Sequence, residues 1–278
     1  MASEKTKEFV CFYMEKFIPH QQNLILQGDA TVSSEGKLRL TKVDEHGEPV
    51  YQSVGRALYM TPVHIRNSET GNVASFFTCF SFSIHAPDVK KTADGLAFFL
   101  SPPNDKPKEG GGYLGLFNPG GKNGQVVAVE FDTFINKDKD IDDRNYLHIG
   151  LNFMSIKSRQ TVPWGFENDN EAYVYISYDT SSASNNALEA TLVYPSSEKS
   201  YPLSVKDVDL RDALPEWVRV GFSAATGKSD PAFVETHDVN FWFFASAFED
   251  DPSTLAQALK GINPRLAAFL PLHFRRAK

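Results

Sequence analysis

Short apolar runs, divided by Gly, Pro, Asn and Asp, follow one another along most of the chain. We expect strands at residues 75–84, 96–100, 126–134, 172–178, 188–193, 218–224 and 239–246. The 3.6-residue periodicity of an amphipathic helix is not sustained in this part of the sequence. Many short strands with turn residues between them are typical of an antiparallel sandwich. The pattern therefore predicts an all-β fold, and the lack of a linker or an internal repeat predicts one domain.

The two ends differ from this central part. Residues 1–7 are charged and lead into no long apolar stretch, so they lack the pattern of a signal peptide. Residues 249–278 contain a short helical pattern closed by Gly261 and then a basic stretch. This end is interpreted either as a partner- or membrane-binding segment or as a disordered or added tail. We expect a domain over residues 8–248 with an extension on each side.

Composition and charge exclude several classes of protein. With 41% hydrophobic residues in 278, the chain can bury a sizeable core, and 22 Phe and 10 Tyr favour strands. A net charge of -7 argues against a nucleic-acid binder. No apolar run reaches the roughly 18 residues of a membrane span. The two cysteines, Cys11 and Cys79, cannot form a disulfide framework or a zinc cluster; a bond between them and two buried thiols both stay open.

The most informative segment is Val-Val-Ala-Val-Glu-Phe-Asp-Thr-Phe at residues 126–134, which places two carboxylates in an apolar strand. Period-two alternation puts Glu130 and Asp132 on one face, about 6.6 Å apart, and Val129 and Phe131 on the other. Burying both carboxylates without a cation would cost several kcal/mol. The strand therefore predicts a positive group beside Glu130 and Asp132.

More ligand types follow this strand, namely Asn136, Asp138, Asp140, Asp142, Asp143 and His148. Ca²⁺ takes only oxygen ligands, which are available from Asp132, the Phe134 carbonyl, Asn136 and Asp143. A transition ion such as Mn²⁺ would take the imidazole of His148 together with Glu130 and shared aspartates. The segment therefore predicts a site for two cations.

Three other interpretations fit this segment less well. An EF-hand loop starting at Asp138 would need Gly and Glu where the chain has Asp143 and Ile149. A solvated acidic turn would explain residues 138–143 but not carboxylates within an apolar strand. A glycosidase with Glu-x-Asp-x-Glu on one strand would need a carboxylate where Phe134 stands. We therefore expect a metal site and no enzymatic activity.

Several motifs resemble, in order, the signature of the legume lectins. They are the 127–134 strand with Asn136 and His148-Ile-Gly, Ala93-Asp-Gly-Leu-Ala-Phe-Phe-Leu100, Gly110-Gly-Gly-Tyr-Leu-Gly115, and Leu214-Pro-Glu-Trp-Val-Arg-Val-Gly-Phe-Ser223. The resemblance covers roughly residues 8 to 248. It implies a jelly-roll, concanavalin-like antiparallel sandwich with a flat back sheet and a curved front sheet. It also implies a plant-defence type of protein that binds sugars without catalysis.

The resemblance also assigns metal ligands. The transition-metal ligands would be Glu130, Asp132, Asp143 and His148, with Ser158 reached through water. The calcium ligands would be Asp132, the Phe134 carbonyl, Asn136 and Asp143. Asp143 is preferred to Asp142 because it keeps the family's commonest spacing to His148, and a slip of one residue stays open.

A sugar site beside the calcium is implied as well. Asp94, after a cis Ala93–Asp94 peptide, would accept hydrogen bonds from two sugar hydroxyls. The other contacts would be the Gly112 N–H, the Phe134 ring, the Asn136 amide, and Lys228, Ser229 and Asp230 in the loop after Gly227. This loop is long and ends Glu-Thr-His-Asp-Val, and in the family that the chain resembles such a loop is typical of binders of galactose and N-acetylgalactosamine rather than of mannose and glucose. A storage or defence protein without sugar binding stays an alternative.

Partners and location follow from the same resemblance. The ligands would be mono- and oligosaccharides and glycoproteins, and the cofactors Ca²⁺ and Mn²⁺ or another transition metal. The resemblance further implies a homodimer or tetramer and a secreted or vacuolar location. No residue pattern locates an adenine-type hydrophobic site.

Overall fold

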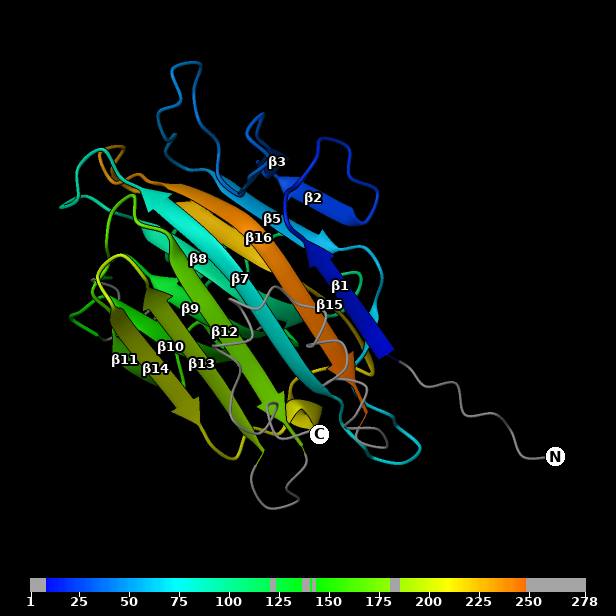
Figure 1. Cartoon of the computed structure of the whole chain (residues 1–278). Coiled ribbons are helices and arrows are strands. Elements are labelled where there is room, and N and C mark those ends of the chain that lie inside the picture. The colour runs from blue at the N-terminus through cyan, green and yellow to red at the C-terminus, as the bar shows by residue number, and fades with distance from the viewer. Residues whose placement is uncertain (1–8, 121–123, 137–140, 142–143, 181–185, 249–278) are drawn as a thin grey trace.

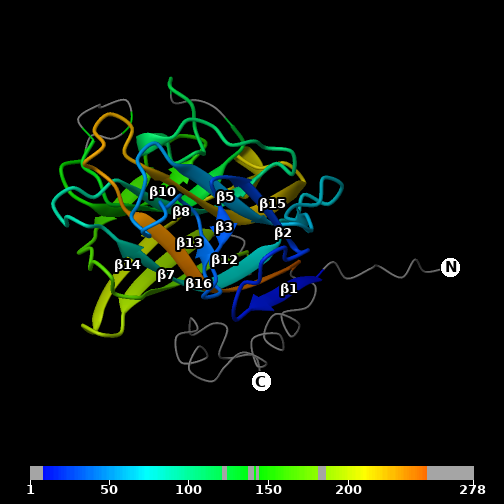
Figure 2. The ribbon, with the colours of Figure 1, turned by 90° about the horizontal axis from the view of Figure 1, so that it is seen from above.

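The protein folds into two antiparallel sheets stacked face to face, as Figures 1 and 2 show. The structure is a computed structural model that describes residues 9–120, 124–136, 141, 144–180 and 186–248. Each of the predicted strands is present. The predicted all-β sandwich is therefore confirmed. No helix within the described residues has the length and hydropathy of a membrane span.

The strands divide between a back sheet and a front sheet. The back sheet has the order β14 (Lys199–Val205), β13 (Ala187–Tyr194), β12 (Ala172–Asp179), β7 (Ser75–His85), β16 (Thr236–Ala247), β4 (Leu38–Arg39) and β3 (Thr31–Val32), and β1 (Phe9–Met14) also pairs with β16. The front sheet has the order β11 (Gln160–Pro163), β10 (His148–Phe153), β9 (Val127–Asp132), β8 (Asp94–Ser101), β15 (Trp217–Thr226), β5 (Val54–Tyr59) and β2 (Leu24–Gly28), and β6 (Val63–His64) pairs with β15. Two 3₁₀ turns, η1 (Gly111–Tyr113) and η2 (Leu210–Asp212), complete the described elements.

Aromatic side chains fill the space between the sheets. Phe80 of β7 packs edge to face on Phe222 of β15, with ring centroids 4.8 Å apart, and Phe82 lies 5.2 Å from Phe131 of β9. Because residues alternate along each strand, one face of every central strand supplies this core. The high Phe content of the sequence is thus used largely between the two layers.

Strand β9 is buried on both of its faces, and this positions the candidate site. Val129 and Phe131 belong to the main core, as the alternation predicts. Ala128 belongs to a second apolar cluster with Leu116 and Phe117 of the loop that follows η1. Glu130 and Asp132 are therefore carboxylates on a strand that water scarcely reaches, being 3% and 7% exposed.

The strand is shorter than predicted, since β9 ends at Asp132 and not at Phe134. The backbone N–H of Phe134 is donated to Oδ1 of Asp132 at 2.7 Å. This local side-chain bond replaces a ladder bond, so the chain turns away from the sheet. Phe134 consequently lies beside the strand end, half-buried.

The cysteines match neither alternative drawn from the sequence. Both are free, and Cys11 is exposed whereas Cys79 is buried. Their strands flank β16, where Cys11 pairs with Ala245 and Cys79 with Phe243. Two strand spacings amount to about 9.5 Å, and a disulfide requires Cα atoms within about 7 Å. The extensions, residues 1–7 and 249–278, lie outside the described residues.

Candidate functional site

The ends of four neighbouring strands lie together at one end of the front sheet. Strand β9 ends at Asp132 and β15 at Thr226, while β8 begins at Asp94 and β10 begins at His148. The ladders pair His148 with Asp132 and Asp94 with Thr226. Because antiparallel neighbours alternate in direction, these starts and ends coincide. The tertiary structure thereby gathers side chains that lie far apart in the sequence.

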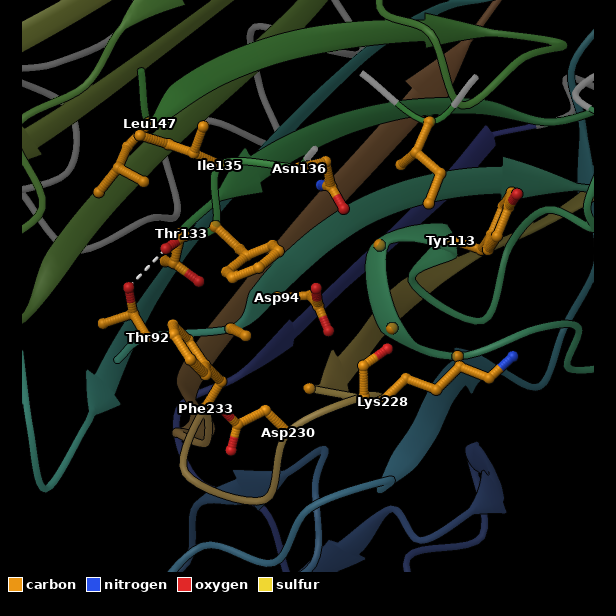
Figure 3. Close-up of a pocket in the computed structure, with 18 of the residues that line it drawn as sticks. Thr92, Asp94, Tyr113, Thr133, Ile135, Asn136, Leu147, Lys228, Asp230 and Phe233 are labelled. Carbon is orange, nitrogen blue, oxygen red and sulfur yellow. Dashed lines mark hydrogen bonds between the residues drawn. The ribbon is translucent and has the colours of Figure 1, made fainter. Parts of the chain in front are cut away.

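A pocket of about 790 Å³ opens at these strand ends. All the residues predicted to contact a sugar line it, namely Asp94, Gly112, Phe134, Asn136, Lys228, Ser229 and Asp230. Figure 3 shows Asp94 in the middle of the pocket, with Asn136 on one side and Lys228 and Asp230 on the other. Sequence reasoning did not single out the apolar lining residues Val89, Tyr113, Ile135, Ile141, Leu147 and Phe233.

Asp94 is a buried carboxylate with unused hydrogen-bonding capacity. It is 5% exposed, and its Oδ2 accepts no hydrogen bond from the residues that the structure describes. Burial, with a smaller effect from the charge of Glu235, raises the pKa of Asp94 to about 7. The Ala93–Asp94 peptide is cis, as expected. A hydroxyl-bearing ligand would supply the donors that this carboxylate lacks.

Gly112 allows the loop over the pocket to approach Asn136. A Cβ at position 112 would lie 2.8 Å from Asn136 Oδ1 and 3.1 Å from Asn136 Nδ2. These distances are too short for a side chain, so a larger residue would push the two segments apart. The geometry leaves little room for a side chain at position 112, and the expected contact of the Gly112 N–H with a sugar stays a prediction.

The loop after β15 is fastened at several points. Lys228 Nζ donates to Glu109 Oε1 at 2.7 Å, and Gln52 Nε2 donates to the Lys228 carbonyl at 3.2 Å. The Phe233 ring stands edge to face against Phe134, with centroids 5.4 Å apart. The sequence carries no signal that Phe233 turns back towards Phe134, because the loop conformation sets that contact.

Three of the residues predicted to hold the transition metal, Glu130, Asp132 and His148, lie next to this pocket. Glu130 Oε1 lies 3.2 Å from His148 Nε2 and also accepts the Ser158 hydroxyl. His148 Nδ1 lies 4.0 Å from Asp132 Oδ2. A Cβ at Gly150 would lie 2.7 Å from Glu130 Oε1, so a glycine leaves the space for this carboxylate. Carboxylates and an imidazole are the donor set that a transition ion takes.

The predicted metal site is only partly within the described residues. Among them, no group of three or more His, Cys, Asp or Glu side chains could hold a metal ion. Glu130 is instead engaged by Ser158 and His148. Asp143, its alternative Asp142, and the neighbouring Asp138 and Asp140 lie outside the described residues. The role of Asp143 as a ligand of both ions therefore stays a prediction.

Comparisons with known proteins show the family of this chain. The legume lectin domain model matches residues 10–260. The seed lectin of Vatairea macrocarpa is 54% identical over 242 residues, covering 87% of this chain and 97% of that protein. The winged bean acidic lectin complexed with methyl-α-D-galactose is 42% identical with a TM-score of 0.80, covering 87% of this chain and 100% of that one. Lectin I of Ulex europaeus, in complex with the methyl glycoside of α-L-fucose, is 38% identical with a TM-score of 0.78, covering 86% and 98%. The chain belongs to the legume lectins, a family of carbohydrate-binding, non-catalytic proteins.

Proposed function

We propose that this lectin binds galactose and N-acetylgalactosamine in the pocket around Asp94, and that binding depends on Ca²⁺ and Mn²⁺ or another transition ion. The observation that carries the proposal is the buried carboxylate of Asp94, whose Oδ2 has no partner among the described residues, in a pocket lined by Phe134, Asn136 and the 228–230 loop. This arrangement pairs a strong acceptor with an apolar surface, which is what a pyranose ring needs.

The chemistry of each side chain fits a sugar. An ionised Asp94 forms hydrogen bonds roughly twice as strong as neutral acceptors do, and it can accept two hydroxyls. The rings of Phe134 and Phe233 meet at 81°, so they form an apolar corner for the C–H face of the sugar. The Asn136 amide and the Gly112 N–H would donate to the remaining sugar oxygens.

The ions would be held by residues at the same strand ends. Glu130, Asp132, Asp143 and His148 would hold the transition ion, with Ser158 reached through water, and Asp132, the Phe134 carbonyl, Asn136 and Asp143 would hold calcium. The donor set fits, because Glu130 and Asp132 are buried carboxylates on either side of the His148 ring. When bound, the ions supply the positive charge that these carboxylates otherwise lack. As a calcium ligand, Asn136 would be restrained beside the sugar.

The choice of galactose rests on the loop after β15. Sugar complexes of fold relatives include both galactose and fucose ligands at similar identity, so the framework alone does not select the sugar. By the family resemblance, the length of the 228–236 segment and the Glu-Thr-His-Asp-Val sequence at residues 235–239 favour galactose-type ligands. Its anchoring by Glu109 and Gln52 supports a preformed contact surface.

Calorimetric titration tests the proposal. Galactose, N-acetylgalactosamine, mannose and fucose are titrated into protein treated with EDTA, and again after Ca²⁺ and Mn²⁺ are restored. Galactose-type binding should weaken at least tenfold in EDTA and return with the ions. Asp94→Asn should weaken it about as much, because removing the charge weakens both hydroxyl contacts, about 1–3 kcal/mol in all; the exposed control Asp212→Asn should not. Binding that ignores chelation would refute metal dependence, and tighter binding of mannose would refute the sugar assignment.

A further inference from the structure

A second buried Glu–His pair lies behind the sugar pocket. Glu235 and His237 are both fully buried, with His237 Nε2 2.9 Å from Glu235 Oε1. On the far side of the ring, His237 Nδ1 lies 3.0 Å from the Thr41 hydroxyl. Neither Glu235 nor His237 lines the pocket. The sugar site as described therefore leaves this pair without a role.

Glu235 is bonded directly to the end of the carboxylate strand. The Thr133 hydroxyl donates to Glu235 Oε1 at 2.5 Å. Thr133 stands between Asp132, a predicted metal ligand, and Phe134, a predicted sugar contact. The Thr92 hydroxyl donates in turn to the Thr133 carbonyl at 2.5 Å, which Figure 3 marks with a dashed line. Thr133 is thus held from both sides, through its hydroxyl and through its carbonyl.

Backbone bonds tie the same three segments together. The Thr133 N–H is donated to the Asp94 carbonyl at 3.4 Å, and the Val234 N–H to the Lys91 carbonyl at 3.2 Å. The loop closes on itself where the Gly227 N–H meets the Phe233 carbonyl at 3.1 Å. The turn before β8, the end of β9 and the loop after β15 therefore converge on Thr133 and Glu235, and these segments line much of the pocket.

Stability alone does not account for a carboxylate at position 235. Its Oε2 has no hydrogen-bond partner among the described residues, and its charge raises the pKa of the neighbouring Asp94. Burying a carboxylate with one oxygen unpaired is costly, and apolar replacements of buried ion pairs are often neutral or stabilising. Hydrogen bonds to a charged acceptor are, however, short and directional. Such bonds fix the relative position of the two groups that donate to them.

We propose that Glu235 is a positioning residue for sugar binding. Without touching the sugar, it holds Thr133 and the loop that ends at Val234, so that Phe134, Phe233 and Asp94 face one pocket. The inference rests on the proposed function, because it names a determinant of that same site.

The test compares Thr133→Val, which removes one hydroxyl at nearly constant volume, with Glu235→Ala and Glu235→Gln. Glu189→Gln on β13 is the control, because Glu189 is exposed. Galactose affinity is measured with Ca²⁺ and Mn²⁺ present, well below the Tm of each variant. Thr133→Val and Glu235→Ala should weaken galactose binding about tenfold, the scale of a lost outer-shell partner. Glu235→Gln, which keeps an oxygen for Thr133, should stay within about threefold.

A second readout does not need the sugar. Amide hydrogen exchange at Thr133 and Val234 should be faster in Glu235→Ala than in the unaltered chain, because both N–H groups bond across the segments that Glu235 joins. A purely structural role would lower Tm and leave the galactose affinity of the folded protein unchanged. If Glu235→Ala does not fold, Thr133→Val alone decides.

The outcomes separate the two proposals. If the unaltered protein binds galactose and all folded variants bind it equally well, the positioning role is overturned while the proposed function stands. If the unaltered protein binds no galactose, the proposed function fails. The exchange rates at Thr133 and Val234 then decide whether Glu235 positions these segments, and unchanged rates overturn that role.

Discussion

Two buried Glu–His pairs stand near the sugar pocket, and they differ in what surrounds them. In the first pair, Glu130 lies 3.2 Å from His148, across β9 and β10. In the second, Glu235 lies 2.9 Å from His237 at the start of β16. All four side chains are almost or fully buried, so neither burial nor residue type distinguishes the pairs.

The two pairs differ in the group that lies nearest to Nδ1 of each histidine. His148 Nδ1 lies 4.0 Å from the second carboxylate, Asp132, whereas His237 Nδ1 lies 3.0 Å from the Thr41 hydroxyl. The first pair therefore has excess negative charge beside an imidazole, which suits a cation. In the second pair a hydroxyl takes the place of that carboxylate, which suits a fixed hydrogen-bond network. The neighbours of the pair decide its role.

The largest effect that would test this difference comes from Asp132→Asn. Asp132 belongs to both predicted metal sites, so its loss should remove or strongly weaken both ions and reduce galactose affinity at least about 100-fold, beyond the 10–100-fold typical of outer-shell changes. Calorimetry with Ca²⁺, Mn²⁺ and galactose measures all three affinities. Metal binding equal to that of the unaltered chain would contradict the assignment of the first pair.

A paired substitution of the histidines comes next in size. We expect His148→Gln to abolish the rise in Tm that Mn²⁺ produces, because ligand binding stabilises only a fold that holds the ion. His237→Gln should lower Tm with and without the ion, by several degrees, yet keep that rise. Thermal unfolding of both variants, each with and without Mn²⁺, makes the comparison. A lost Mn²⁺ response in His237→Gln would show that the two pairs are not distinct.

The smallest expected effect concerns the pH dependence of stability and the influence of Glu235 on Asp94. In the metal-free protein the pKa of Asp94 is raised to about 7 by burial and by Glu235, against about 3.9 in an unfolded chain. A raised pKa means that the folded state prefers the protonated form. This contribution to stability is complete below about pH 4 and is lost as pH rises to about 7.

Asp94→Asn carries no charge at any pH, so it should raise the metal-free Tm on the order of 5 °C at pH 8 and change it little at pH 4. Glu235→Gln should shrink that gain, because it removes the neighbouring charge, whereas the exposed Glu189→Gln should not. Melting curves in EDTA at the two pH values provide the measurement. An equal gain at both pH values would mean that Asp94 is not protonated on folding.

Much of the site could be predicted from residues that share a strand or a motif. The alternation in β9 correctly placed Val129 and Phe131 in the core and Glu130 and Asp132 opposite them. The residues predicted to contact a sugar, from Asp94 to Asp230, all line one pocket. The strand prediction succeeded because a strand has a strict two-residue period. The sugar-contact roles came from the family resemblance and stay predictions.

The contacts missed by the sequence all join separate segments. Phe233 and Glu235 lie in the loop after β15, yet their partners Phe134 and Thr133 follow a strand about 100 residues earlier. Cys79 fell in a predicted strand, but its separation from Cys11 depends on β16 lying between β1 and β7. Strand order and loop conformation are set by packing of the whole domain, which no local pattern encodes.

The amino-acid sequence by itself determined the all-β class, the apolar and acidic faces of β9 and the family, because these depend on periodicity and on residue order. Only the tertiary structure decided which residues face the same pocket and which of the two Glu–His pairs has a second carboxylate beside it. The reason is physical: the charge and hydrogen-bond partners of a buried group come from strands that are neighbours in space but not in sequence.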